Sequence, residues 1–375
     1  MKNLSSLLLA AIVVFPKIIF SQDYDIYLSD AGNFSSPPWQ ILKYDQNGEN
    51  GQVFISENLG WPQDILFLEE QNRVLISNLN TDSVNSYNST TGEFQDLFAA
   101  EADGPTRMQF GPDGHIYILQ WFGNGKVLRY DVDGTYLGEF TETGVSRSIG
   151  MAWDEEGNLY VSSYNQSTVR KFSPTGEDLG LFISSGINGP TNIWFDETGN
   201  FFVNNYNANN VLQFAGDGTP NGVFIGSIGQ PEGVAITENG SLLIGNGAAG
   251  KVIKYEADGT FIEELIPSQP FSLLTPNAVI LRSTSGLSAK NQDRYKHVNV
   301  VPNPGDKFEL SSEIPIRAET VTIFDQSGKE VFGNQVDSAI LWNAENAGVG
   351  VYTLRIKFEN GDEIARKVMV TREKN

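Results

Sequence analysis

The stretch GNLYVSSYNQSTVRKFSPTGE, residues 157–177, decides the fold because copies of it recur along most of the chain. It holds two short β-like runs, a polar loop between them and a glycine turn at its end. An apolar residue followed three positions later by an aromatic residue marks each copy. These pairs are Ile41/Tyr44, Val84/Tyr87, Val127/Tyr130, Val169/Phe172, Val211/Phe214 and Val252/Tyr255. The turn glycines after them are Gly48, Gly92, Gly134, Gly176, Gly218 and Gly259, so copies begin about 42 residues apart, the length of a propeller blade.

Two further series divide each copy into four strands. An earlier turn falls at Asn72, Gly114, Gly157, Gly199 and Gly240, and the copies begin at Pro62, Pro105, Ser148, Pro190, Pro231 and Pro276. A four-stranded unit has two apolar faces that it cannot bury alone, and stacking such units in a ring buries both. The sequence therefore predicts an all-β fold, a six-bladed β-propeller over residues 22–283.

Ring closure is predicted from an incomplete first copy. That copy begins at DIYLSD (25–30), a second-strand pattern, and lacks a first strand. The missing pattern occurs after the sixth copy as TPNAVILRS (275–283). We expect residues 275–283 to pair beside residues 25–29.

The repeats resemble the NHL-repeat and streptogramin-lyase-like propellers, most clearly in PEGVAITENGSLLIGNGAAGKVIKYEADG (231–259). The resemblance implies the fold but leaves function open, because the family includes enzymes, metal-dependent lactonases and binding scaffolds. The lyase chemistry relies on histidine. The chain has two histidines: His115 in a turn on the face opposite the channel loops, and His297 in a linker. The resemblance therefore does not carry the lyase activity to this chain.

A second domain follows a polar linker at residues 284–297. Residues 298–375 show five to seven alternating strands, with hairpin turns expected at Ser327-Gly328 and Asn360-Gly361, which fits an Ig-like β-sandwich. Four segments in order resemble the type A C-terminal sorting domain of the type IX secretion system. They are Val301–Pro304, Val321–Asp325 leading to Gly328-Lys329, Gly348–Leu354 and Lys367–Val370. The resemblance implies passage across the outer membrane, then removal of the domain or attachment to the cell surface; a sugar-binding Ig module is the alternative.

Composition agrees with an exported protein. Residues 1–21 follow the pattern of a signal peptide, with Lys2 before an apolar run, although Pro16 and Lys17 interrupt that run; an anchor helix is the alternative. The chain has no cysteine, which excludes disulfides and thiolate chemistry. Its net charge of −21 disfavours binding to nucleic acid or anionic lipid. We expect no transmembrane segment in the mature protein, which is secreted or displayed on the outer surface and has the type IX machinery as a partner.

The starts of the copies supply candidate channel residues: Gln63, Asp64, Thr106, Arg107, Asn192, Glu232 and Asn277. Carboxylate and amide oxygens are the ligands that calcium prefers. Asp64, Asn192, Glu232 and Asn277 are therefore candidate calcium ligands, with the alternative that they satisfy backbone groups or hold water. With calcium bound, the protein would be a lactonase-like hydrolase.

Aromatic residues in the loops after the second strands offer a binding surface instead. These candidates are Trp39, Trp121, Phe122, Tyr164 and Tyr206, which antiparallel topology places on one face. Exposed aromatic rings stack on sugars or anchor protein partners, although such rings also pack between blades. The sequence predicts a binding or interaction module without catalytic residues that binds a glycan or a surface protein. The alternative is the metal-dependent lactonase.

Overall fold

The computed structural model describes residues 24–100, 102–284, 298–301, 307–311, 318–325, 330–335, 340–358 and 363–371. The expected signal peptide and most of the expected linker, with His297, lie outside these residues. So do Pro302–Pro304, Gly328-Lys329 and both expected hairpin turns of the second domain.

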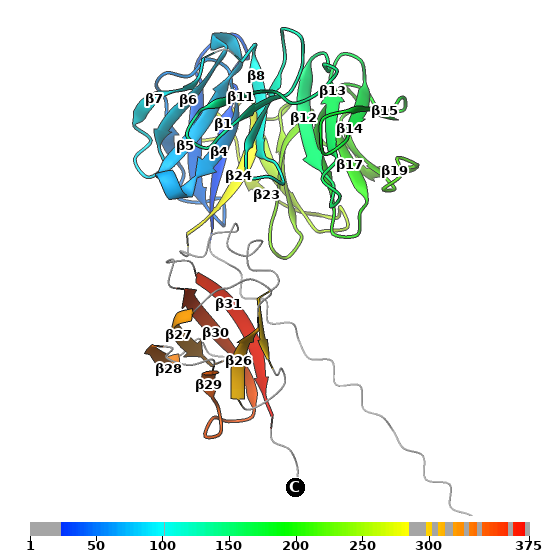
Figure 1. The fold of residues 1–375 in the computed structure, drawn as a ribbon. Helices are drawn as coiled ribbons and strands as arrows, with labels where there is room; N and C mark the ends of the chain where they lie inside the picture. The colour runs from blue at the N-terminus through cyan, green and yellow to red at the C-terminus, as the bar shows by residue number, and fades with distance from the viewer. Residues whose placement is uncertain are drawn as a thin grey trace, which may run out of the picture. The chain divides into compact units, whose positions relative to one another are not determined.

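The predicted six-bladed propeller is confirmed, with six four-stranded antiparallel sheets between Tyr24 and Ser283 (Figure 1). Blade 2 is β4 (Pro62–Leu68), β5 (Arg73–Asn78), β6 (Ser83–Asn88) and β7 (Phe94–Ala99). Blade 3 is β8 (Pro105–Phe110), β9 (Ile116–Gln120), β10 (Leu128–Tyr130) and β11 (Tyr136–Glu139). Blade 4 is β12 (Ser148–Trp153), β13 (Leu159–Ser163), β14 (Thr168–Phe172) and β15 (Asp178–Ile183).

The remaining blades include the ring closure. Blade 5 is β16 (Pro190–Phe195), β17 (Phe201–Asn205), β18 (Asn210–Phe214) and β19 (Pro220–Ile225). Blade 6 is β20 (Pro231–Ile236), β21 (Leu242–Asn246), β22 (Lys251–Tyr255) and β23 (Phe261–Ile266). Blade 1 has the order β24 (Pro276–Ser283), β1 (Tyr24–Asp30), β2 (Gln40–Asp45) and β3 (Gln52–Ile55), so the closing strand pairs as expected.

The residues that mark the repeat pack and turn the chain as their spacing predicts. All six apolar and aromatic pairs of the third strands are buried, and apolar clusters join neighbouring blades. The turn glycines have positive φ, from 72° at Gly48 to 92° at Gly134, and Asn72 takes the same left-handed conformation with φ 51°. A glycine adopts this conformation at no steric cost, which explains its repeated use.

Short polar side chains tie each of blades 1 to 5 to the next blade around the central channel. Ser29 Oγ donates to the carbonyl of Pro62, and Ser77 Oγ to that of Thr106. Further bonds of this kind are Thr106 to Ser148, Ser162 to Thr191, Thr191 to Pro231, and Asn277 to Pro62. These bonds hold the innermost strands in register, which fixes the side chains that face the channel.

The described residues from Val298 onward form seven strands in two sheets. One sheet has the order β25 (Asn299–Val301), β26 (Lys307–Ser311), β29 (Ile340–Asn343). The other has the order β28 (Glu330–Gln335), β27 (Ala318–Phe324), β30 (Gly350–Phe358), β31 (Glu363–Val370). Both sheets contribute to one buried core, in which the rings of Phe308 and Trp342 stack with their centroids 5.6 Å apart. The number of strands agrees with the prediction, and the Ig-like assignment stays a prediction.

Candidate functional site: the mouth face and the channel

The propeller has two ends of different construction. We call the end with the loops after the second strands the mouth face, and the end with the tight glycine turns the turn face. At the mouth face, each chain segment that leads into an innermost strand lies beside the loop of its own blade. The two segments are bonded in all six blades. These backbone bonds are Ala31 N to Thr275 O, Leu79 N to Trp61 O, Trp121 N to Gly104 O, Tyr164 N to Arg147 O, Tyr206 N to Gly189 O and Gly247 N to Gln230 O.

In five blades a polar residue at the end of the second strand reinforces this construction, whereas in blade 6 the equivalent Asn246 accepts from Ala249 N in its own loop. Asp30 is the strongest example: its buried carboxylate accepts from the backbone N–H groups of Gly32, Leu274 and Thr275, and from Gln40 Nε2. Asn78, Gln120, Ser163 and Asn205 bond the lead-in segments of their own blades. The sequence carried a signal for this role, because all six copies have a polar residue here, but the repeat markers that predicted the fold did not include it.

The residue before each innermost strand adopts the left-handed conformation in five blades. Two of the five are glycines, but Trp61, Arg147 and Gln230 keep side chains at φ 54°, 52° and 48°. Left-handed backbone costs a residue other than glycine roughly 1–2 kcal/mol. Such outliers concentrate at functional sites, where they aim a side chain.

A continuous aromatic row crosses blades 3, 4 and 5 at the mouth face. The rings of Trp121 and Tyr164 lie 5.6 Å apart, and those of Tyr164 and Tyr206 lie 6.0 Å apart. The guanidinium of Arg147 lies 5.3 Å from the Trp121 ring and 4.5 Å from the Phe122 ring. Four of the five predicted ligand-binding aromatics therefore come together, but Tyr206 is almost fully buried and exposes little of its ring.

The fifth predicted aromatic residue, Trp39, belongs to a separate group formed by the loop of blade 1 and the residue before the innermost strand of blade 2, Trp61. Trp39 Nε1 donates to the carbonyl of Phe34 at 2.9 Å, and the Phe34 ring lies 5.5 Å from that of Trp61. Phe34, Trp61 and Arg147 were not among the residues predicted from the sequence. A signal for the latter two was present, since both precede the first residue of a repeat copy.

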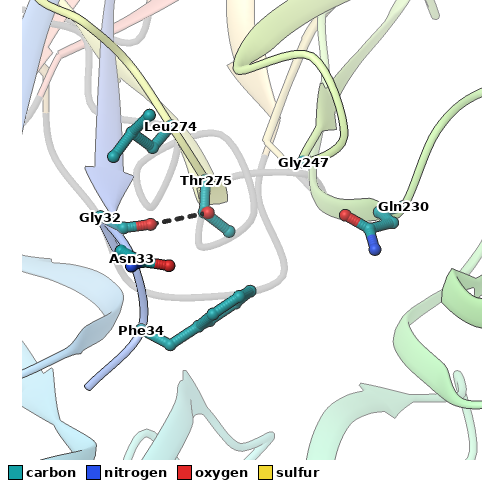
Figure 2. A pocket seen from close by; sticks show the side chains of 7 residues that line it. All are labelled: Gly32, Asn33, Phe34, Gln230, Gly247, Leu274 and Thr275. Atoms are coloured by element: carbon teal, nitrogen blue, oxygen red, sulfur yellow. Dashed lines mark hydrogen bonds between the residues drawn. The ribbon is translucent and has the colours of Figure 1, made fainter. Parts of the chain in front are cut away.

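A pocket of about 420 Å³ opens beside this second group, where the loops of blades 6 and 1 meet. Its walls include Phe34 and Asn33 from blade 1, Gln230 from blade 6, and Leu274 with Thr275 from the lead-in segment of β24. Figure 2 shows the Phe34 ring and the Gln230 amide on different sides of the space, with Thr275 above the Phe34 ring in this view and bonded to Gly32. The pocket is small and mixed in polarity, and it belongs to the mouth face.

Arg107 fills the channel behind the mouth. Its Nε donates to Asn192 Oδ1 at 2.7 Å, and one Nη donates to the carbonyl of Asn277 at 2.5 Å. The other Nη donates to the carbonyl of Gln63. Glu232 Oε1 lies 3.4 Å from the guanidinium, in a pair whose side chains are both almost fully buried. One arginine thus links the innermost strands of blades 1, 2, 5 and 6 to its own blade 3.

Burial dominates the electrostatics of the two channel carboxyls. Desolvation raises the pKa of Glu232 to about 7, against the opposing effect of Arg107. Desolvation also raises the pKa of Asp64, whose Oδ2 accepts from the backbone N–H of Met108 at 2.8 Å. The pKa of Tyr206 is raised as well, mainly by burial and secondly by the negative charge of Glu232. The last residue of the aromatic row therefore interacts electrostatically with a channel carboxyl.

Three of the four predicted calcium ligands contact this arginine, and the fourth, Asp64, interacts with its charge while accepting from Met108 N. Asn192 and Glu232 contact its guanidinium directly, and Asn277 contacts it through its backbone carbonyl. The guanidinium therefore occupies the place among these oxygens that a cation would take, and the set as arranged does not fit a calcium ion. Among the described residues, no group of three or more His, Cys, Asp and Glu residues is arranged to hold a metal. The calcium site stays a prediction.

Two other groups that the sequence brought into consideration lie away from the channel. His115 is in the turn between β8 and β9, on the turn face, with its Nδ1 3.9 Å from Asp131 Oδ1. Asp131 and Asp133 belong to a tight turn, in which the N–H of Gly134 donates to Asp131 O and that of Thr135 to Asp133 Oδ1. In the described part of the chain, no helix is long and apolar enough to cross a membrane.

Comparison with known proteins separates the two parts of the chain. Residues 299–371 match the secretion system C-terminal sorting domain, which confirms the predicted sorting domain and marks the chain for export by the type IX system to the cell surface or beyond. No curated protein matches the chain.

Three of the solved structures similar to this chain share its propeller fold at low sequence identity. A chain of the nidogen/laminin complex has 13% identity and a TM-score of 0.57, over 69% of this chain and 98% of its own. A protein of unknown function from Bacteroides caccae has 18% identity and a TM-score of 0.56, over 69% and 98%. A putative gluconolactonase has 15% identity and a TM-score of 0.50, over 56% of this chain and 80% of its own. At these identities the likeness concerns the fold alone.

Proposed function

We propose that this exported propeller is a binding module whose mouth face contacts an extracellular ligand. The observation that supports this most is the row of Trp121, Tyr164 and Tyr206 with Arg147 stacked on its outer end. Aromatic rings offer a large contact area at low cost in conformational entropy, and they are enriched among the residues that dominate binding energy.

The face is held rigid before any ligand arrives. The six backbone bonds between loops and lead-in segments fix the loop backbones, and Tyr164 Oη donates to Asn207 Oδ1 at 3.0 Å. A preorganised surface loses little conformational entropy on binding, so that more of the contact energy contributes to affinity.

An array of glycans and extracellular proteins, probed with the labelled full-length chain, tests this proposal. We expect Trp121→Ala to lower the captured signal about tenfold or more, as the loss of a central aromatic contact does. Phe261→Ala is the matched control, because Phe261 is 61% exposed but lies on the outer strand β23. An absence of binding by the wild type, or an equal effect of both variants, would overturn the proposal.

The alternative is a calcium-dependent, lactonase-like enzyme in the channel. Within the described residues, Asn204 Oδ1 and Asn277 Oδ1 are buried without a hydrogen-bond partner, which leaves two oxygens for a ligand. The guanidinium of Arg107 among the expected ligands argues against a cation there. Calorimetric titration with calcium distinguishes the two functions. Binding heat that disappears in Glu232→Gln would support the enzyme, and an absence of heat would support the binding module.

A further inference from the structure

We infer that the pocket between blades 6 and 1 binds a single neutral sugar ring. This inference rests on the proposed function of the mouth face and names the ligand class of one part of it. The pocket's volume of about 420 Å³ falls at the lower end of ligand sites, which span roughly 300–1,000 Å³.

The lining of the pocket selects against charged ligands. None of the described residues that line it is acidic, basic or a histidine. The whole chain has a net charge of −21, which repels anions in particular. A ligand that suits this lining is therefore neutral.

Phe34 supplies an exposed ring in a fixed position. The residue is 39% exposed and left-handed, with φ 55°. Trp39 Nε1 holds its carbonyl at 2.9 Å, and its ring rests against Trp61. A fixed aromatic ring at the wall of a small pocket provides an apolar surface for the C–H face of a pyranose.

Amide groups supply the polar half of the recognition. Within the part of the chain that the structure describes, Asn33 and Gln230 make hydrogen bonds only through their backbone groups, so both side-chain amides are available to a ligand. Gln230 keeps its side chain at φ 48°, where Gly104 and Gly189 occupy the equivalent places in blades 3 and 5. An amide both donates and accepts, which matches neighbouring hydroxyl groups. An apolar ring and two unused amides together are the chemistry of a neutral sugar site.

Saturation-transfer NMR of the full-length chain with methyl glycosides of glucose, galactose, mannose and N-acetylglucosamine tests the inference. We expect binding of at least one glycoside in the millimolar range, with transfer strongest to ring C–H protons on one face. Phe34→Ala and Gln230→Gly should each weaken binding about tenfold or more. Gln230→Gly is a clean variant, because glycine suits the left-handed backbone and the change removes only the amide side chain.

Phe261→Ala, on the outer strand β23, is the control and should leave glycoside binding unchanged. Trp121 does not line the pocket, so its contribution to capture on the array is measured separately from the effects of Phe34→Ala and Gln230→Gly on glycoside binding. The inference is overturned if no glycoside binds, if neutral peptides compete equally well, or if Phe34→Ala and Gln230→Gly bind as the wild type does. If the array signal in those cases still depends on Trp121, the proposed function stands without the sugar pocket.

Discussion

At the turn face all six blades turn on a glycine of positive φ between their third and fourth strands, whereas at the mouth face the blades diverge. Asp154 and Asp196 each cap a glycine turn by accepting backbone N–H groups, and the glycines there have φ 80°. At the mouth, equivalent places hold Trp61, Gly104, Arg147, Gly189 and Gln230, which share a backbone conformation but not a chemistry. The repeats therefore keep the turn residue constant at one end and vary the side chains at the other, on a shared backbone conformation.

The largest expected change in the free energy of unfolding comes from a comparison of two aspartates, one at each face. Asp30→Ala leaves several buried backbone N–H groups without an acceptor at the ring closure, each costing about 1–3 kcal/mol. We expect the free energy of unfolding to fall by about 4 kcal/mol or more, measured by urea titration. Asp196→Ala, in an exposed turn, should cost about 1 kcal/mol. Equal losses in the two variants would show that the mouth anchors are no more important than the turns.

The next comparison concerns two arginines. Arg107→Met leaves Glu232 buried without its partner, and breaking a buried pair in this way costs about 3–5 kcal/mol. Arg73→Met removes the more exposed pair with Asp96, near the turn face, and should cost less than about 1 kcal/mol. Urea unfolding of both variants measures the difference, and a mild effect of Arg107→Met would contradict a central role for this arginine in the channel.

The third prediction follows from the raised pKa of Glu232. Its pKa is about 7 in the folded chain, against an ordinary value of 4.5, so between these values the folded state holds a proton that the unfolded state has lost. The contribution of Glu232 to stability therefore falls as the pH rises from 4.5 to 7. The total change is up to roughly 3 kcal/mol, at about 1.36 kcal/mol for each unit of pKa.

Comparison of the wild type with Glu232→Gln isolates this contribution, because Asp64 titrates in both proteins. Unfolding free energies measured from about pH 4.5 to about pH 8 should show the wild type losing stability relative to the variant, and then a constant difference above about pH 7. Parallel curves for the two proteins would refute the raised pKa.

The smallest expected change in stability comes from a comparison of two glycines with positive φ. A methyl group on Gly104 would lie 2.6 Å from Phe122 Cδ2, whereas one on Gly114 would meet nothing within 4 Å. Alanine at either position incurs the left-handed cost of roughly 1–2 kcal/mol. Only Gly104→Ala should also displace Phe122 from Arg147 and weaken ligand capture by the mouth face. Thermal melting combined with the array measures both effects, and equal capture by the two variants would separate Phe122 from binding.

Sequence periodicity predicted the architecture because every blade repeats the same burial pattern. The pairs such as Val169/Phe172 recur where each blade packs on its neighbour, and the echo of Pro231–Val234 at Pro276–Val279 identified the closing strand. Comparison of one copy with the next reveals the positions that the copies share. The buried pairs and the turn glycines, which all six blades have in common, could therefore be predicted.

The site was only partly predictable because its chemistry lies in the differences between copies. Arg107 was recognised as a channel residue, but its position along β8 does not reveal that a long side chain reaches Asn192, Gln63 and Asn277 in other blades. Phe34 lies in the loop of the incomplete first copy, where no repeat marker applies. Tyr206 was correctly placed on the mouth face, yet its burial depends on packing that spacing alone does not specify.

The closing strand β24 also bears on what happens to the protein after export. β24 ends at Ser283, and the match to the sorting domain begins at residue 299, so every strand of the ring precedes the sorting sequence in the chain. A proteolytic cut between these points removes the sorting domain but leaves β24 paired to β1, and no strand edge of blade 1 loses its partner. Removal of the sorting domain by such a cut would therefore leave all four strands of blade 1 in place.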